Sequence, residues 1–277
     1  MADPGFTLDV ANAIAHLRFS RGEDHNTMLP EFWREFPAAL RALDDGAQAR
    51  VLVISSSGRH FSGGMDLSVF ENAIPLGKEQ GRTRARLRQT ILDLQDCFSL
   101  LERVRMPVLA AMQGGCIGAG LDMACACDCR YATQDAFFVI QEINLGLTAD
   151  LGTFPRLCRL MPEGMVRQMA YTGERLSAAR ARELGLVNDI FPDQDAMLIH
   201  VMALAKEIAE KSPLAVQGSK AMINYARDHS IVDTLDFAAT WQAGMFHPEN
   251  DMAEALRAKR EKRAALFADL LPAKKGL

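Results

Sequence analysis

The sequence predicts an α/β protein with a largely parallel sheet and a helical C-terminal region. Its first half alternates short apolar runs with longer helical patterns, and from about residue 163 the pattern stays helical. Such alternation is typical of parallel strands covered by helices. With 277 residues, 49% of them hydrophobic, the chain can bury one large core. We expect an α/β core over residues 1–200 and a helical region over residues 201–277.

The strands are expected in the first half of the chain. Residues 49–56 ("ARVLVISS") are rich in β-branched side chains and lead into a turn-like segment, which predicts a buried strand. An apolar stripe at helical spacing predicts a helix over residues 83–104. The elements expected next are a strand over residues 106–114, a helix over 118–127, and strands over 129–133 and 136–140.

Helices are expected in the second half. Residues 177–187 predict a helix with Ser177 as its N-cap and Gly185 as its C-cap. Residues 195–213 have an amphipathic pattern, and we expect Pro213 to end that helix. The charged segment 252–270 also predicts a helix.

Composition excludes several classes of partner. The net charge of −4 and the pI of about 5.9 give no positive field to attract nucleic acid or membrane surfaces. The N-terminus lacks the pattern of a signal peptide, and the most apolar window contains Gln113, Asp122 and four glycines, which is wrong for a membrane span. We therefore expect a soluble, cytoplasmic protein with no nucleic-acid or membrane partner.

The cysteines suggest a metal site only weakly. Cys125, Cys127 and Cys129 would share one face of a strand, but no second pair of Cys or His residues stands at a zinc-ligand spacing. Free cysteine is usually a small buried hydrophobe. We expect no bound metal.

The segment "GGCIGAGLD", residues 114–122, is the first candidate for a functional site. A phosphate-binding P-loop needs Lys-Ser or Lys-Thr after its last glycine, whereas Leu121 and Asp122 follow Gly120. The glycine order also differs from the dinucleotide fingerprint, and the carboxylate of Asp122 would repel a phosphate. A helix start with exposed amides instead suits an oxygen that becomes negative only during a reaction.

A second glycine loop, "HFSGGMDL" at residues 60–67, follows the strand predicted over residues 49–56. Two such loops at the carboxyl ends of parallel strands mark the place of a ligand crevice. On composition alone, both segments could equally be tight turns.

Three acids stand in apolar surroundings. Asp122 follows the glycine loop, Glu142 follows "AFFVI", and Asp150 lies between Ala149 and Leu151. Burial would raise their pKa values and suit them to proton exchange near neutrality. Each acid also has a structural explanation. Asp122 could stabilise a helix start or pair with an arginine, Glu142 could be ion-paired at the edge of the core, and Asp150 could be an N-cap.

These segments resemble the crotonase (enoyl-CoA hydratase/isomerase) superfamily, and more narrowly the delta-3,5-delta-2,4-dienoyl-CoA isomerases. The resemblance is carried by "FSGGMDL", by residues 114–153 and by "SPLAVQGSKAMINYARDHS", and it extends from about residue 50 to residue 245. It implies a crotonase-like spiral of β-β-α units. It also implies that the C-terminal helices serve as an oligomerisation or lid region of a homotrimer or homohexamer.

The resemblance assigns roles to the two loops. It implies that the backbone amides of Met65 and Ala119 form an oxyanion hole for an acyl-CoA thioester. Many relatives carry glycine where Ala119 stands, and its amide survives that change. The coenzyme A portion would contact the loop residues Ser62, Gly63, Gly64, Met65 and Asp66, and the basic segment 258–263 would either approach its phosphates or be a solvated face. Because coenzyme A is part of the substrate, no separate cofactor is expected.

The resemblance also separates two activities. Dienoyl-CoA isomerases carry acids at all three positions, whereas hydratases have glutamates at the first two and usually a small residue at the third. It thus implies that Glu142 is the base at carbon 2, that Asp150 is the acid at carbon 6, and that Asp122 holds and tunes Glu142.

The leading hypothesis is an isomerase that converts 3,5-dienoyl-CoA to 2,4-dienoyl-CoA in unsaturated fatty-acid β-oxidation. A 2-enoyl-CoA hydratase, with Asp122 and Glu142 handling a water, is the first alternative. The second is an RNA-binding or scaffolding crotonase-like protein, against which the acidic pI argues.

Overall fold

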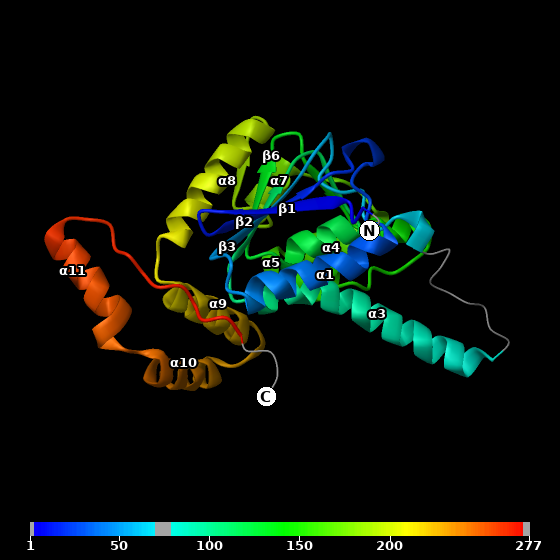
Figure 1. Cartoon of the computed structure of the whole chain (residues 1–277). Coiled ribbons are helices and arrows are strands. Elements are labelled where there is room, and N and C mark those ends of the chain that lie inside the picture. The colour runs from blue at the N-terminus through cyan, green and yellow to red at the C-terminus, as the bar shows by residue number, and fades with distance from the viewer. Residues whose placement is uncertain (1–2, 70–78, 274–277) are drawn as a thin grey trace.

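The computed structural model describes residues 3–69 and 79–273 and has the expected α/β architecture (Figure 1). A six-stranded sheet has the order β1-β2-β3-β4-β6-β9, and a three-stranded sheet has the order β5-β7-β8. All neighbours in the larger sheet are parallel except the antiparallel pair β1–β2, which confirms the predicted parallel sheet. The strands are β1 Phe6–Ala11, β2 Ile14–Phe19, β3 Val51–Ser56, β4 Val108–Met112, β5 Gly115–Ile117, β6 Cys129–Thr133, β7 Phe137–Val139, β8 Leu176–Ser177 and β9 Asp189–Phe191.

Helices cover the larger sheet on both faces and make up most of the second half of the chain. The α-helices are α1 Pro30–Asp45, α3 Gln80–Arg103, α4 Ala119–Ala126, α5 Thr153–Leu160, α6 Glu163–Thr172, α7 Ala178–Glu183, α8 Gln194–Ala209, α9 Pro213–Asp228, α10 Ile231–Met245 and α11 Ala253–Glu261. Within the described residues there are also three short helical segments: η1 Gly22–Asp24, η2 Glu142–Leu145 and η3 Pro248–Met252. The predicted boundary at residue 200 falls inside α8.

The core explains why the central strands are mainly apolar and do not alternate with polar residues. Every residue of β3 and β4 is buried. Leu52 and Ile54 belong to the cluster that includes side chains of α1, α3 and α4, whereas Val51 and Val53 pack with side chains of α8. A parallel strand covered on both faces has no polar side, so its sequence cannot alternate.

The pairing of β3 with β4 brings the two glycine loops together. Leu52 is opposite Val108 and Ile54 is opposite Ala110, in parallel register. Both strands therefore end at the same edge of the sheet, and the segments that follow them meet there in an isolated bridge between Ser62 and Cys116.

The structure corrects three local predictions. The helix predicted over residues 177–187 is α7, which has the expected N-cap Ser177, but its C-cap is Leu184, and Gly185 follows in the left-handed region. The next helix ends at Ala209, before Pro213, which instead opens α9 because the first turn of a helix needs no proline N–H. The helix predicted over residues 252–270 ends at Glu261.

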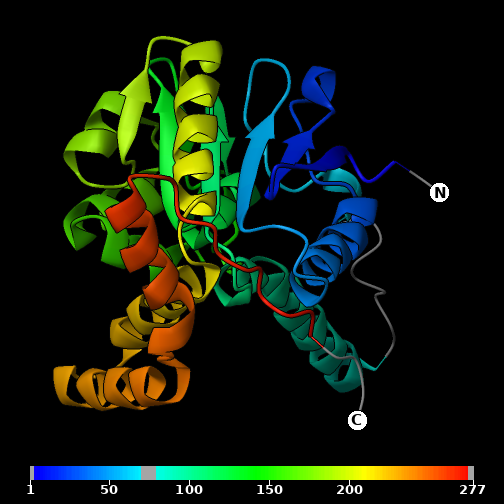
Figure 2. The same ribbon diagram turned by 60° about the vertical axis from the view of Figure 1, so that its left-hand side comes forward.

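The C-terminal helices α9, α10 and α11 project from the α/β core, and the chain then returns to it as an extended segment (Figures 1 and 2). Arg50 pairs with Asp269 at 2.7 Å and donates to the carbonyl of Phe267 at 2.6 Å. Arg105 donates to the carbonyl of Leu271, and Ala273 N–H donates to the carbonyl of Asp45. In the described part of the chain, no helix is long and apolar enough to cross a membrane.

A buried lysine ties α9 to the core. Lys220 Nζ donates to the carbonyls of Leu101 and Met106 at 2.7 and 2.9 Å and pairs with Asp128 at 2.9 Å. Only 6% of the lysine side chain is exposed. Asp128 also accepts the N–H of Val108 at the start of β4, so the lysine joins α9, the end of α3 and the central sheet.

We predict that Lys220→Met lowers the free energy of unfolding by about 3 kcal/mol, because it leaves a half-buried carboxylate and two carbonyls without their donor. Urea unfolding would measure the loss. The matched control is Lys206→Met on the exposed face of α8, where a change below about 0.5 kcal/mol is expected. A loss below about 1 kcal/mol in Lys220→Met would contradict the prediction.

Candidate active site

The start of α4 presents backbone amides without partners. Gly118 has φ +52° and ψ −120°, and its N–H donates to the carbonyl of Val139 at 3.0 Å. Ala119 opens the helix, so its N–H has no carbonyl one turn earlier in α4. Among the described residues, no other group accepts it. The sequence prediction of a helix start with a free amide is therefore correct.

In the loop after β3, the backbone amide of Met65 is free. The N–H groups of Ser62, Gly63 and Asp66 donate to the carbonyls of Gly115, His25 and Met28, and that of Gly64 donates to Ser62 Oγ. The Met65 N–H has no acceptor within the described part of the chain. Ser62 is fully buried, and its hydroxyl donates to the carbonyl of Asn26. Of the five predicted substrate-contacting residues in this loop, only Met65 has an available backbone donor.

Close backbone packing brings the loop that contains Met65 against the start of α4. Gly64 has φ +92°, and a Cβ on it would lie 2.7 Å from the carbonyl oxygen of Ile117 and 3.2 Å from Ala119 N. A Cβ on Gly120 would lie 3.0 Å from Ser62 Cβ. Only glycine permits these approaches. The geometry therefore suits an oxygen held by the amides of Met65 and Ala119, as the resemblance implies.

Asp122 lies one turn into α4 and is fully buried. Its Oδ1 accepts the N–H of Thr153 at 2.6 Å and the hydroxyl of Thr153 at 2.7 Å, whereas no described residue bonds its Oδ2. Burial raises the pKa of Asp122 to about 7; the Thr153 hydrogen bonds oppose this rise, and the charges of Glu142 and Asp150 add to it. The predicted raised pKa is confirmed, and the partner of Asp122 is a threonine rather than an arginine.

Glu142 opens η2 directly after β7 and stands beside the start of α4. Its Oε1 lies 3.3 Å from the place that a Cβ on Gly118 would occupy. Its Oε2 is buried and has no hydrogen-bond partner in the described residues, and no ion pair there engages it. Burial raises the pKa of Glu142, and the charge of Asp150 adds to the rise. An acid at this place is adjacent to the free amide of Ala119.

Asp150 lies on the loop before α5, and it is more exposed than its sequence surroundings suggested. Ala149 and Leu151 are buried, but Asp150 itself is exposed, and its backbone carbonyl accepts Gln95 Nε2 of α3 at 2.6 Å. It lines a cavity of about 450 Å³ between this loop and α3. Partial burial still raises the pKa of Asp150. The predicted N-cap role is excluded, since the N-cap of α5 is Gly152.

A cationic cavity of about 550 Å³ adjoins the loop after β3. Gly63, Ile117 and Phe137 connect it to the free amides, and the described residues that line it include no acid. Burial lowers the pKa of His60, and the charges of His25, Arg59 and Arg175 lower it further. The residues with cationic or basic side chains in its wall are His25, Arg59, His60 and Arg175. An anionic group placed here would meet favourable charge.

Sequence reasoning missed the residues that support this site. The only sequence feature that pointed to a role for Thr153 was its place in "DLGT", three residues after Asp150. Arg59 and His60 stand in the turn-like segment after β3, whereas His25 and Arg175 come from distant parts of the chain, so no local pattern joins them.

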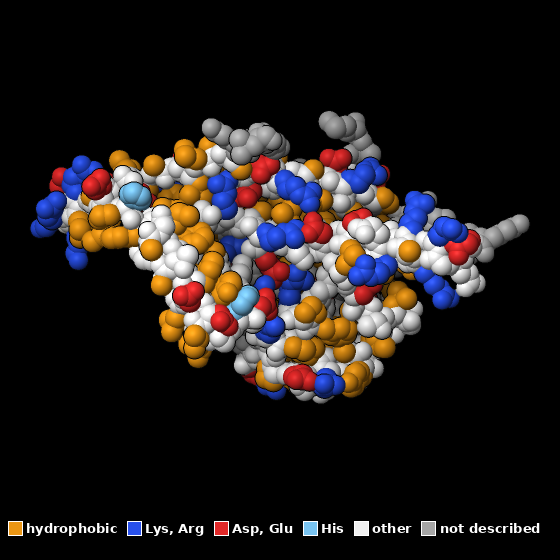
Figure 3. Space-filling view, turned by 90° about the horizontal axis from the view of Figure 1, so that it is seen from below, with side chains coloured by type: hydrophobic (Ala, Val, Ile, Leu, Met, Phe, Trp, Pro, Cys, Tyr) orange, Lys and Arg blue, Asp and Glu red, His pale blue; other side chains and the backbone are white. Residues whose placement is uncertain are grey.

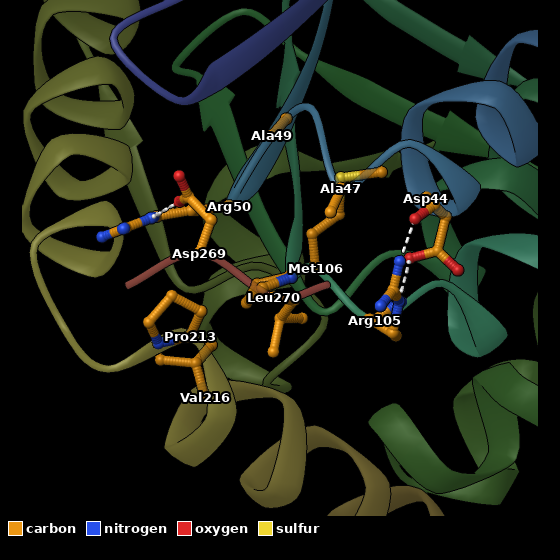
Figure 4. Close-up of a pocket in the computed structure, with 11 residues that line it drawn as sticks. Asp44, Ala47, Ala49, Arg50, Arg105, Met106, Pro213, Val216, Asp269 and Leu270 are labelled. Carbon is orange, nitrogen blue, oxygen red and sulfur yellow. Dashed lines mark hydrogen bonds and ion pairs between the residues drawn. The ribbon is translucent and has the colours of Figure 1, made fainter. Parts of the chain in front are cut away.

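Two other hollows are not lined by any of the three candidate acids, Asp122, Glu142 and Asp150. A cleft where the C-terminal segment crosses α1 and α9 has a volume of about 20 Å³, room for a single water, and is closed by the ion pairs of Arg50 with Asp269 and Arg105 with Asp44 (Figure 4). A groove of about 800 Å³ lies among α9, α10, α11 and the returning segment. Within residues 3–69 and 79–273, no cluster of His, Cys, Asp or Glu side chains could hold a metal ion.

Comparisons with known proteins identify the family of this chain. Residues 9–270 match the enoyl-CoA hydratase/isomerase family. The mitochondrial Delta(3,5)-Delta(2,4)-dienoyl-CoA isomerase of Mus musculus is 39% identical over 253 residues, which are 90% of this chain and 77% of the relative. The peroxisomal Delta(3,5)-Delta(2,4)-dienoyl-CoA isomerase of Arabidopsis thaliana is 37% identical over 262 residues, or 94% of each chain.

The fold comparison covers nearly the whole chain. A crystal structure of an enoyl-CoA hydratase from Bacillus anthracis superposes with a TM-score of 0.85 at 25% identity, covering 98% of this chain and 100% of the other. The predicted crotonase-like fold is therefore confirmed. On the sequence match and the fold together, the chain belongs to the enoyl-CoA hydratase/isomerase family.

Proposed function

We propose that this protein is a delta-3,5-delta-2,4-dienoyl-CoA isomerase. One observation carries the proposal: Asp122, Glu142 and Asp150 all have raised pKa values, and the charges of Glu142 and Asp150 act on Asp122. Glu142 also stands beside the start of α4, where the amide of Ala119 is free. The isomerases of Mus musculus and Arabidopsis thaliana, similar over at least 90% of this chain, support it.

In the proposed reaction, the thioester oxygen accepts hydrogen bonds from the amides of Met65 and Ala119. Glu142 removes a proton from carbon 2, and the electron pair spreads through the two double bonds to carbon 6. Asp150 then delivers a proton to carbon 6, which leaves double bonds at carbons 2 and 4. The amides stabilise the enolate oxygen, and each such donor contributes about 10²–10³ in turnover. The reaction needs no cofactor beyond the coenzyme A of the substrate.

The separation of the acids favours isomerisation over hydration. Carbons 2 and 6 are too far apart for one short side chain, so two groups on different elements are required. Glu142 lies on η2 and Asp150 on the loop before α5, and their charges act on each other. Hydration by Asp122 and Glu142 stays the alternative, as the similarity to an enoyl-CoA hydratase allows. That reaction would leave Asp150 without a role.

The cationic cavity supports a coenzyme A thioester as the substrate. It opens beside Gly63, next to the amides that would hold the thioester oxygen, and its wall carries Arg59 and Arg175. Phosphates of coenzyme A would be neutralised there. The basic residues of α11 and of the turn after it do not line this cavity. Arg257 and Arg263 pair with Glu254 instead.

We further propose that the protein works in β-oxidation of unsaturated fatty acids, which is where 3,5-dienoyl thioesters arise. A cytoplasmic location stays a prediction, since the two isomerases carry mitochondrial and peroxisomal names.

Self-association through the C-terminal helices is also proposed. Helix α10 has 15 residues and buries none of them. Its apolar side chains Ile231, Val232 and Leu235 are between 66% and 79% exposed. Figure 3 shows hydrophobic side chains gathered on the underside of the end that carries α10 and α11. Apolar helix faces of this kind need a partner surface. A homotrimer or homohexamer would supply it.

Asp150→Asn should slow isomerisation of a 3,5-dienoyl-CoA about 10²–10⁴-fold, because the amide cannot deliver the proton to carbon 6. Growth of the conjugated 2,4-dienoyl thioester absorbance would measure it, with hydration of crotonyl-CoA followed in parallel. The matched control is Asp195→Asn on the exposed part of α8. Isomerisation that survives in Asp150→Asn, or a wild type that mainly hydrates, would contradict the proposal.

Arg59→Gln should raise KM for the acyl-CoA about threefold to fivefold with little change in kcat, because an exposed charge contributes to uniform binding. An acyl-pantetheine thioester, which lacks the nucleotide phosphates, should show the same KM with both enzymes. Arg167→Gln on the exposed face of α6 is the control. Equal effects on both substrates would rule out a phosphate contact.

Leu235→Glu should dissociate the assembly, since it places a charge in the apolar face of α10. Sedimentation velocity would show wild type above the 30.5 kDa of one chain and the variant at that mass. Ile199→Glu on α8 is a control at an equally exposed apolar side chain. A monomeric wild type would refute self-association.

A further inference from the structure

The only hydrogen bonds to the buried carboxyl of Asp122, among the described residues, come from one residue. Thr153 donates both its N–H, at 2.6 Å, and its hydroxyl, at 2.7 Å, to the same oxygen, Oδ1. The other oxygen, Oδ2, is buried and receives nothing from the described chain. The carboxyl is therefore fixed in one orientation with all its donors on one side.

The position of Thr153 is set by the start of a helix. Gly152, with φ +125°, is the N-cap of α5, and Thr153 is the first helical residue, with 2% of its surface exposed. Its N–H has no carbonyl one turn earlier in α5, and α5 packs against α4, so this amide points to Asp122. The partial positive charge of the helix start and the two donors all favour the ionised form of Asp122.

The charges of two other acids, Glu142 and Asp150, also act on Asp122. The titratable and charged groups on the elements packed around it are Glu142 on η2, Asp150 before α5, Cys116 on β5, Cys125 on α4, and the ion pair of Arg156 on α5 with Glu102 on α3.

Of these groups, Glu142 and Asp150 are the carboxyls whose pKa values burial raises. Glu102 and Arg156 neutralise each other at 2.7 Å. Burial raises the pKa of the Cys125 thiol to about 12 and that of Cys116 well above its usual range. That leaves Glu142 and Asp150 as the neighbouring acids whose charges raise the pKa of Asp122.

We infer that Thr153 is a positioning residue that decides which carboxyl of the site carries the proton: its hydroxyl keeps Asp122 ionised, and the ionised Asp122 makes Glu142 the stronger base. This inference rests on the proposed function for its catalytic consequence and on the two hydrogen bonds for its structural part. Without the hydroxyl, Asp122 keeps one donor, the backbone N–H, and binds a proton more readily. A protonated Asp122 no longer repels the charge on Glu142, which then accepts the carbon 2 proton less well.

The test is Thr153→Val, which keeps the size of the side chain and removes the hydroxyl. The pKa of Asp122 rises to about 7 in the wild type, so the acidic limb of kcat/KM against pH should lie near neutrality. In Thr153→Val that limb should move up by about one pH unit, because loss of a donor disfavours the charged form. Near pH 6 the kcat/KM of Thr153→Val should be about tenfold below that of the wild type, and near pH 9 the two values should agree within about twofold.

Matched variants separate positioning from packing. Thr153→Ser restores the hydroxyl and should return the limb to its wild-type position, whereas Thr153→Ala, which also lacks it, should shift the limb as Thr153→Val does. Thr148→Val makes the same chemical change at an exposed threonine of the same loop and should leave the profile where it is. A limb that stays in place in Thr153→Val, or that moves equally in Thr153→Ser, overturns the inference.

A titration without substrate distinguishes this inference from the proposed function. Infrared spectra of protein labelled with ¹³C at the aspartate carboxyl, with and without Asp122→Asn, isolate the band of Asp122. Its midpoint should rise by about one pH unit in Thr153→Val or Thr153→Ala and not in Thr153→Ser. If the Asp122 midpoint shifts in the variants as expected but the wild type does not isomerise 3,5-dienoyl-CoA, the proposed function alone is refuted. An unshifted midpoint refutes the role of Thr153 alone.

Discussion

The candidate site depends on the close backbone contact between the loop after β3 and the start of α4. At Gly64 and Gly120 the two segments approach so closely that a Cβ atom would meet the other segment at 2.7 to 3.0 Å. The parallel pairing of β3 with β4 brings the two segments to one edge, and the bridge between Ser62 and Cys116 fixes their register. The other amides of residues 62–66 all have acceptors within the described chain, which leaves Met65 as the one free donor of that stretch.

The same packing creates the unusual charge state of the acids. Asp122 stands on the buried side of α4, and burial is the largest cause of its raised pKa. A lone carboxyl in this place would be protonated and inert at neutral pH. Thr153 and the start of α5 oppose that tendency, so the pKa lies near the pH at which proton exchange is useful. Strong burial and compensating donors are both required for this result.

The sequence predicted the parts of the structure that depend on local pattern. β3 and β6 are strands that the apolar and β-branched runs predicted, and the glycine order predicted the start of α4. The sequence predictions failed where tertiary contacts determine the structure. Pro213 is compatible with either the end of one helix or the first turn of the next. Asp150 shows the limit most clearly, because its neighbours Ala149 and Leu151 are buried in the folded chain whereas Asp150 itself is exposed.

Exposure of the three acids is graded, and the gradient suits the proposed reaction. Asp122 is fully buried, Glu142 is partly buried and Asp150 is exposed. After one turnover Glu142 has gained a proton and Asp150 has lost one, so the enzyme must restore both before the next substrate. An exposed Asp150 can take its proton from water, whereas a buried acid at carbon 6 would have to wait for transfer from Glu142. The burial that makes Asp122 responsive to Thr153 is thus needed only at the inner end of the site, and solvent access is an advantage at the outer end.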